Sequence, residues 1–440
     1  MRKRVVITGL GVCAPNGIGL AEFTEALQTG KSGVRFHPQL KTLQFGCQVA
    51  AEPYVPIQHV ERYFTTLQLR GLNASGIVYG VIAGKDAWND AGLAMQTGES
   101  PDWDSGIIFG TGILGVDKFR ESIYLVDDNN VRRLGSTAVI QTMASGISAY
   151  LGGMLGCGNQ VTTNSSACTT GAEGILMAYE RIASGKAERM LTGSCSDSGP
   201  YVWGGFDAMR VLPRQYNERP TEASRPMSAS AAGFVPGSGA GALVLESLES
   251  ALARGAKIYA EVLGGAVNSG GQRGEGSMTA PNSQAVQRCI VQAIENSGIK
   301  KSDVDAINGH LTATTKDPLE IENWSKALGR SGSEFPYVNS FKGLFGHCLA
   351  AAGSIESVAT VLQFQEQQIF GNINCEDVHP AIEQIIDESR IPKKTFAYSP
   401  KIIAKASFGF GDVNACVIFK VFKEQGATLQ SVVAKSHYKF

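Results

Sequence analysis

Residues 162–197 constrain the fold more than any other segment, because one apolar helix stands there between two strand-like runs. Apolar side chains recur at helical spacing from Ala172 to Ile182. Gly185 is a stop signal for that helix, and residues 189–193 have the composition of a strand. The segment therefore predicts a strand, a tight turn, a buried helix and a second strand, with Cys168 at the turn.

Cys168 is a candidate nucleophile, since its predicted place is a helix N-terminus. Unpaired backbone N–H groups and the positive end of the helix dipole favour a thiolate there. The alternative is an inert core residue, because free cysteines are often buried without a reactive role. The chain has nine cysteines, an odd and scattered set without a CxxC pair or metal-ligand spacing. That usage indicates a reducing, cytoplasmic setting and no metal site.

Composition excludes several classes of protein. The chain has 440 residues, 43% of them hydrophobic and 18% charged, which is enough for two domains or one duplicated domain. A formal net charge of −1 gives no electrostatic case for binding nucleic acid or a membrane surface. No apolar run approaches the roughly 20 residues that a membrane span needs.

Strand-like and helical segments alternate along the chain, which indicates the α/β class. The sequence also echoes itself. Residues 163–165 precede Cys168 and its helix, much as residues 338–340 precede His347 and an alanine-rich helix. A glycine turn followed by a strand occurs at 239–245 and again at 409–419. These echoes predict two duplicated halves.

Other segments carry weaker patterns. They predict a helix over 67–91, a buried or interface helix over 140–155, irregular backbone over 31–56, a surface excursion over 118–134, loops over 201–227 and 268–278, and a frayed tail after Lys423.

Two of the six histidines follow predicted strands directly, in small-residue surroundings. These are His310 and His347. Sites in α/β sheets gather where strand ends open onto loops, so both are candidates to meet Cys168. The alternative for each is a buried histidine held by hydrogen bonds.

Four motifs occur in order along the chain. They are SSACTTG at 165–171, NGHLTATTKDPLE at 308–320, NSFKGLFGHCLAAAGSIE at 339–356 and SFGFGDVNA at 407–415. Together they resemble the β-ketoacyl synthases, and the synthase II type most of all. The resemblance runs from Arg4 to about Phe422. It implies a thiolase-like fold in α-β-α-β-α layers, divided into halves at 1–255 and 256–440. It also implies a homodimer, with a heterodimer as the alternative.

The resemblance implies decarboxylative Claisen condensation. Cys168 would carry the acyl chain as a thioester. A malonyl-acyl carrier protein would then lose carbon dioxide, and His310 and His347, as neutral imidazoles, would stabilise the resulting carbanion. The acyl chain would grow by two carbons, as in fatty-acid elongation. The backbone N–H groups of Cys168 and Phe410 would form the oxyanion hole. Lys342 would bridge to a glutamate, for which the candidates are Glu320 and Glu356.

The family's substrate contacts carry over to several positions. Thr312 and Thr314 match threonines that contact the phosphopantetheine arm. Phe410 matches the residue that gates the acyl pocket in the family, and Phe408 is a candidate substrate contact; the alternative for both phenylalanines is a plain core aromatic. The pocket floor is expected to include Ile113 and the 140–155 helix. No cofactor is implied, because the phosphopantetheine arrives on the carrier. A basic patch is expected to dock the acidic carrier, with the candidates Arg70, Arg132, Arg133 and Arg225.

The chain departs from the family around these turns. Leu311, Ala313 and Thr315 stand where Gly, Ser or Gly, and Pro are usual, and Asp412 replaces a glycine of the gating loop. The 268–278 loop lacks the usual aspartate and histidine. These departures keep a dedicated ketosynthase of a polyketide or polyene pathway open as an alternative. A non-catalytic chain-length partner subunit and a degradative thiolase are further alternatives, both disfavoured by one cysteine with two histidines.

Overall fold

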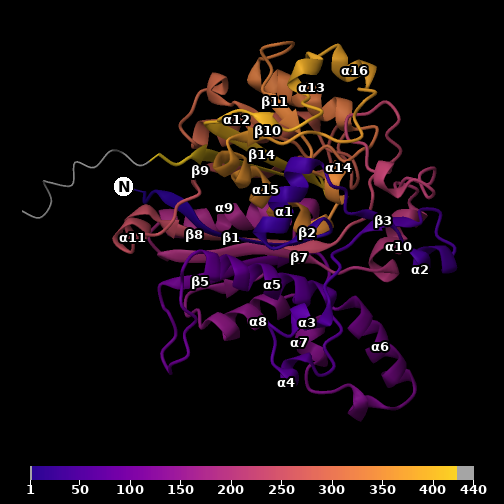
Figure 1. Cartoon of the computed structure of the whole chain (residues 1–440), viewed down its shortest axis with the longest axis vertical. Coiled ribbons are helices and arrows are strands. Elements are labelled where there is room, and N and C mark those ends of the chain that lie inside the picture. The colour runs from indigo at the N-terminus through magenta and orange to yellow at the C-terminus, as the bar shows by residue number, and fades with distance from the viewer. Residues whose placement is uncertain (1, 424–440) are drawn as a thin grey trace, which may run out of the picture.

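The computed structural model describes residues 2–423, and the predicted frayed tail lies outside that range. Its framework is an 11-stranded mixed sheet (Figure 1). Along the chain, the principal strands are β1 (Val5–Ala14), β5 (Ser105–Thr111), β6 (Val161–Thr162), β7 (Arg189–Ser196), β8 (Gly239–Ser247), β9 (Ala260–Ser269), β10 (Ala306–Asn308), β11 (Tyr337–Asn339), β14 (Ile402–Gly409) and β15 (Val413–Val421).

The sheet consists of two units with the same topology. The first runs β6-β5-β7-β8-β1 and the second runs β11-β10-β14-β15-β9. In each unit the first two pairings are parallel and the last two are antiparallel. β1 and β9 join the units through three antiparallel residue pairs. The predicted α/β fold with two duplicated halves is therefore confirmed. The division after residue 255 falls in the link before β9 and stays a prediction.

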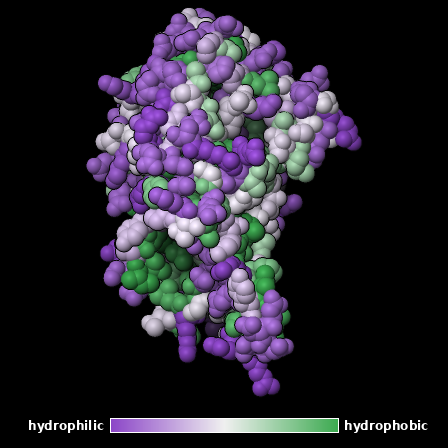
Figure 2. Space-filling view, turned by 90° about the vertical axis from the view of Figure 1, so that its right-hand side faces the viewer, coloured by the Kyte–Doolittle hydropathy of each residue, from purple (hydrophilic) through white to green (hydrophobic). Residues whose placement is uncertain are grey.

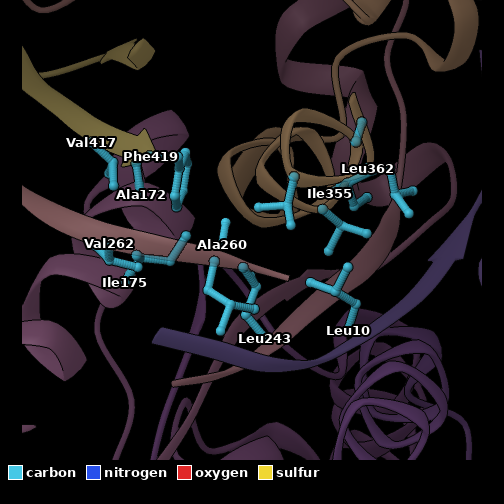
Figure 3. Close-up of a cluster of buried hydrophobic side chains, with 14 of the residues drawn as sticks. Leu10, Ala172, Ile175, Leu243, Ala260, Val262, Ile355, Leu362, Val417 and Phe419 are labelled. Carbon is cyan, nitrogen blue, oxygen red and sulfur yellow. The ribbon is translucent and has the colours of Figure 1, made fainter. Parts of the chain in front are cut away.

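Helices complete a five-layer stack (Figure 1). α9 (Thr170–Ala183) and α15 (Ala352–Glu366) lie between the two units and share one apolar core with both (Figure 3). α5 (Ser75–Asp90) and α8 (Gly146–Leu155) cover the outer face of the first unit. α12 (Ser283–Asn296) and α13 (Asp317–Leu328) cover that of the second. Aliphatic side chains such as Ile355 and Leu362 face the strands across this core, as the apolar patterns require.

The remaining elements connect these layers. They are β2 (Gly17–Ile18), α1 (Leu20–Thr29), β3 (Val34–Phe36), α2 (Pro38–Thr42), β4 (Val49–Ala51), α3 (Ile57–Val60), α4 (Thr66–Leu69), α6 (Val116–Asp127), α7 (Ala138–Thr142), α10 (Pro200–Ala208), α11 (Leu248–Ala253), α14 (Lys342–Phe345), β12 (Gln368–Ile369), α16 (Pro380–Glu383) and β13 (Phe396–Ala397).

The two central helices touch at their N-termini through a pair of glycines. A Cβ on Gly171 would lie 2.3 Å from the backbone nitrogen of Ser354, and one on Gly353 would lie 2.6 Å from that of Ala172. Only glycine permits so close an approach of two backbones. The contact brings together the turns that precede α9 and α15, where Cys168 and His347 stand.

Several predictions from weak patterns are wrong in detail. The predicted loop at 201–227 begins with α10, whose Gly204 and Gly205 hide the helical pattern although Trp203 is buried. The predicted helix at 67–91 is two helices, α4 and α5, separated at Gly71 with φ 74°. Residues 31–56 contain the β3–β4 pair and α2, and residues 140–155 contain the end of α7 and all of α8.

Within residues 2–423, no helix is both long and apolar enough to cross a bilayer. All nine cysteines lie in this range, and none forms a disulfide.

Candidate active site

Cys168 lies in a single 3-10 turn, Ala167–Thr169, that leads directly into α9. Ala167 has a left-handed φ of 50°, so the turn is sharp. The equivalent turn before α15, Leu349–Ala351, also begins with a left-handed residue, Leu349 at φ 53°. Both halves therefore use the same elbow before the central helix.

His310 follows β10 in a turn that two buried carboxylates hold. The Glu320 carboxylate accepts the backbone N–H of His310 and that of Leu311, both at 2.7 Å. Asp317 accepts the N–H groups of Thr312 at 2.9 Å and Ala313 at 3.1 Å. Leu311, where glycine is usual in the family, and Ala313, where serine or glycine is usual, have φ of 21° and 64°. The carboxylates thus stabilise a backbone path that side-chain-bearing residues rarely adopt.

His347 follows α14, and its ring is oriented by the backbone. The N–H of Leu349 donates to Nδ1 at 3.1 Å, so in the neutral imidazole the proton sits on Nε2. The His347 N–H donates to the carbonyl of Val235 at 2.8 Å, which fixes the turn. His347 is therefore held as a donor through Nε2.

The three predicted groups converge. The Sγ of Cys168 and one ring nitrogen from each histidine all lie within 4.8 Å of one another. The histidine ring centroids are 5.3 Å apart and nearly perpendicular. Two nitrogens and a sulfur are also donors that soft metals accept, but the sulfur would have to lose its proton to ligate.

The Cys168 sulfur rests as a thiol. Burial raises its pKa to about 11, against the pull of the Phe410 backbone N–H and the Lys342 ammonium, which lower it. The expectation of a thiolate from the helix N-terminus alone is therefore corrected, because desolvation of the charged form prevails. The Phe410 N–H nevertheless favours negative charge on the sulfur.

Both imidazoles are neutral. Burial, reinforced by Lys342 and Lys405, holds the pKa of His310 and that of His347 well below the ordinary range. His310 Nδ1 is buried and has no hydrogen-bond partner within the described residues. The site therefore offers two uncharged rings: His347 can donate through Nε2, and His310 keeps an unpaired Nδ1 among the described residues.

Lys342 pairs with only one of its two candidate acids. Its Nζ lies 2.5 Å from Oε1 of Glu356. Glu320 instead binds the His310 turn. The second Glu356 oxygen pairs with Lys405, 2.8 Å away. All three charged side chains are buried.

Phe408 and Phe410, predicted from the resemblance to contact substrate and to gate the acyl pocket, lie beside the cluster. Phe408, on β14, places its ring 6.3 Å from that of His310. Phe410 follows β14, with its ring 6.2 Å from that of Phe206 on α10. Phe234 links the two regions, with ring centroids 5.4 Å from Phe206 and 5.2 Å from His347. One continuous aromatic wall therefore runs from the gate to the site.

Asp412 ties the gating loop to the neighbouring loop. Its buried carboxylate accepts the backbone N–H of Gln272 at 3.0 Å and that of Asn282 at 2.8 Å. Asp412 itself has φ 61°, a conformation that the family's glycine adopts without strain. The hydrogen bonds to Asp412 therefore hold two loops together although its backbone is strained, and we call this contact the Asp412 latch.

We expect Asp412→Gly to loosen this latch, because two backbone N–H groups lose a charged acceptor while φ 61° stays accessible. Hydrogen exchange of segments 270–282 and 409–412 should quicken by about tenfold or more. Asp387→Gly is the matched control, since Asp387 accepts the backbone N–H of Ser389 in a distant turn. Unchanged exchange in the Asp412 variant would contradict the latch.

The predicted substrate-binding residues lie at the periphery of this cluster. The hydroxyls of Thr312 and Thr314 lie 3.1 Å apart and half-buried on the His310 turn. Ile113 follows β5 and is 53% exposed in the single chain, so it closes no pocket within this chain.

Three of the four predicted docking arginines are exposed. They are Arg70, Arg132 and Arg133. Arg225 is not available in the same way, because its guanidinium pairs with Glu376 at 2.9 Å and Asp377 at 3.0 Å. The role of Arg225 in docking stays a prediction, with its positive charge already paired.

Sequence reasoning missed four residues of the site. Lys405 stands in an apolar strand, and a lone lysine in such a run was the available signal. Asp317 was quoted only as part of a motif. Phe206 lies in the segment predicted to be a loop, and no motif contains Phe234.

Comparison with known proteins agrees with this geometry. Residues 2–251 match "Beta-ketoacyl synthase, N-terminal domain", and residues 259–376 match "Beta-ketoacyl synthase, C-terminal domain". The chain is 33% identical to 3-oxoacyl-[acyl-carrier-protein] synthase I, chloroplastic, of Arabidopsis thaliana, over 96% of this chain and 87% of that protein. It is 32% identical to 3-oxoacyl-[acyl-carrier-protein] synthase 2 of Vibrio harveyi, over 96% and 100%.

A solved structure is similar along the same length. It is a type II PKS acyl-carrier protein in complex with its ketosynthase bound to the hexaketide, matched with a TM-score of 0.85 and 28% identity over 96% of this chain and 100% of that chain. The family domains cover both halves, and each half supplies part of the Cys168–His310–His347 cluster. The chain belongs to the β-ketoacyl synthase family.

Proposed function

We propose that this chain catalyses decarboxylative Claisen condensation of an acyl group with a malonyl-acyl carrier protein, as in fatty-acid elongation. The observation that carries the proposal is the convergence of one thiol and two neutral imidazoles within 4.8 Å, at the junction of the two halves. The thiol supports covalent acyl transfer, and the imidazoles support stabilisation of an enolate.

The first half-reaction loads the enzyme. Cys168 Sγ attacks the acyl thioester, the new S–C bond forms, and the carrier leaves as a thiol with the proton that Cys168 gives up. The carbonyl oxygen becomes negative during attack. The backbone N–H groups of Cys168 and Phe410 both lower the pKa of the Cys168 thiol, and we assign them to that oxygen.

The second half-reaction extends the chain. The carboxylate–carbon bond of the malonyl group breaks, carbon dioxide leaves, and the electron pair spreads onto the thioester oxygen. His347, donating through Nε2, and His310 stabilise that oxygen. The enolate carbon then attacks the acyl-Cys168 carbonyl. Collapse of the tetrahedral intermediate expels the Cys168 sulfur as a thiolate, which takes a proton from solvent to restore the thiol, and releases a 3-oxoacyl carrier that is two carbons longer.

Intact-protein mass after mixing with acyl-carrier thioesters tests this proposal. We expect a gain of one acyl group on the native chain and none on Cys168→Ala, because only the thiol can form the thioester. Cys157→Ala is the matched control, since Cys157 is the other half-buried cysteine. Acylation that survives in Cys168→Ala would rule out this nucleophile.

We propose an acyl carrier protein as partner and the arm of its phosphopantetheine as the group that enters the site, with no resident cofactor. Thr312 and Thr314 stand where that arm would pass the His310 turn. Arg70, Arg132 and Arg133, on and near α4 and α6, supply exposed positive charge for an acidic carrier. The KM for the carrier should therefore rise with salt, and a salt-independent KM would exclude this docking mode.

We also propose a cytoplasmic homodimer. Figure 2 shows hydrophobic surface around a hollow in the lower part of one face. That part contains α6 and α7 (Figure 1), on which Phe119 and Val139 are exposed. A patch of this kind favours a protein partner, and a partner there would also cover Ile113. Light scattering should give twice the chain mass; a monomer, or a complex only with a second synthase-like chain, would contradict it.

A dedicated ketosynthase of a polyketide or polyene pathway is the second candidate. The observations in its favour are the Asp412 latch and the presence of Leu311 and Ala313 in the His310 turn, which depart from the family's usual gate and turn. Failure to restore growth of a strain that lacks its fatty-acid elongation synthase would favour this candidate, and full restoration would count against it.

A further inference from the structure

Lys405 is a fully buried lysine beside the candidate active site. It stands on β14, and its Nζ lies 2.8 Å from Oε2 of Glu356 and 3.1 Å from Oγ of Ser407. The carbonyl of Ala406 also accepts from it. A buried ammonium is unfavourable unless it is paired and hydrogen-bonded, and Lys405 meets both conditions.

Glu356 lies between two ammonium groups from different elements. Lys342 of α14 forms an ion pair with Oε1, and Lys405 of β14 forms one with Oε2. With only Lys342 present, Glu356 would keep one oxygen free and could rotate. With both lysines, the carboxylate plane and therefore the position of Lys342 are fixed.

We propose that Lys405 is a positioning residue for decarboxylation: by holding the second oxygen of Glu356, it fixes Lys342 against the His310–His347 pair. The inference rests on the proposed function of that pair. The cluster carries two positive charges and one negative charge, so it presents a net positive charge to both rings.

The charge matters because His347 works through one tautomer. Its Nδ1 accepts the Leu349 N–H. A protonated Nδ1 could not accept this hydrogen bond, so the ring would lose the contact that orients it. Lys342 and Lys405 both lower the pKa of each histidine, which keeps Nδ1 free of that proton. Loss of Lys405 should therefore raise both histidine pKa values.

Other charged groups face Lys405 from the surrounding elements. Glu320 of α13 acts on it with Glu356 of α15 and Lys342 of α14, and burial lowers the pKa of Lys405 itself. Cys416 of β15 is the remaining titratable neighbour, and burial keeps its pKa well above the ordinary range, so it stays a neutral thiol.

The test compares Lys405→Met with the native enzyme in two separate steps. One is Cys168 acylation by an acyl carrier thioester, followed by intact mass. The other is the release of carbon dioxide from malonyl carrier protein as a function of pH. We expect the rate of acylation to change by less than about threefold and the rate of decarboxylation to fall about tenfold or more. The acid limb of the pH profile of decarboxylation should also move to higher pH.

Lys405→Gln is the second variant, since it keeps a hydrogen-bond donor without the charge, and its acid limb should also move upward. Lys420→Met is the matched control, because Lys420 is exposed on the adjacent strand β15. Lys405→Met leaves one lysine paired with one glutamate, so no buried charge is stranded and folding is expected.

The inference would be overturned if the acid limb of the decarboxylation pH profile stays in place in both variants while acylation and decarboxylation fall together. Lys405 would then serve stability alone. The proposed function fails separately, if the native enzyme is neither acylated at Cys168 nor able to decarboxylate malonyl carrier protein.

Discussion

His347→Ala is expected to abolish condensation while Cys168 still accepts an acyl group. The ring donates through Nε2 because the Leu349 N–H occupies Nδ1, and we propose that this donor stabilises the enolate oxygen. Removing a preorganised donor of this type costs roughly 10²- to 10³-fold in rate. Acylation uses the backbone N–H groups near the sulfur, so its rate should change far less.

Two measurements separate the steps: intact mass for acylation, and release of the 3-oxoacyl carrier for condensation. His379→Ala is the matched control. Its Nδ1 also accepts a backbone N–H two residues ahead, that of Ala381 at 3.1 Å, but it caps α16 away from the cluster. The control should lose about 1 kcal/mol of stability and no activity. Equal loss of acylation and condensation in His347→Ala would show that the ring serves the site's structure instead of the enolate.

Much of this site could be predicted from the order of elements. A thiol before a small-residue helix, and two histidines directly after strands, are local patterns, and the echo between the halves predicts that their turns meet. The contact of Gly171 with Gly353 shows why: each glycine stands at the same place in its half, so the duplication itself brings the two helix N-termini together.

Charge pairing could not be predicted in the same way. The partner of Lys342 was ambiguous between Glu320 and Glu356 because both lie within reach along the motifs, and only the fold separates their roles. Lys405 pairs with a residue 49 positions earlier, on a different layer, so no spacing rule finds it. The pKa of Cys168 depends on burial, which local helix reasoning leaves out.

The strained His310 turn explains why two acids are buried beneath it. Leu311 and Ala313 hold φ values of 21° and 64° that favour glycine. Such a turn persists only when its surroundings determine it strongly. Glu320 and Asp317 do so by accepting four consecutive backbone N–H groups, from His310 to Ala313. The strain of placing Leu311 and Ala313 in this turn is thus offset by these hydrogen bonds.

Glu320→Gln should therefore displace His310 and lower decarboxylation by roughly tenfold to a hundredfold. A glutamine can accept only one of the two N–H groups, and its own NH₂ then faces the other, which leaves a buried donor unpaired at a cost of ~1–3 kcal/mol. Rates of carbon dioxide release and free energies of unfolding measure the two effects. Glu322→Gln is the matched control on the same helix, because Glu322 is exposed and pairs with Lys326.

The pH dependence of this variant has a definite sign. Burial raises the pKa of Glu320 to about 7, above its ordinary value of 4.5. The folded state therefore binds a proton that the unfolded chain releases, and this contribution to stability is complete below about pH 4.5 and lost as pH rises through about 7. Glutamine does not titrate, so the stability deficit of Glu320→Gln should narrow between about pH 5 and pH 7. A deficit that is constant or widens over this range would show that Glu320 remains ionised throughout.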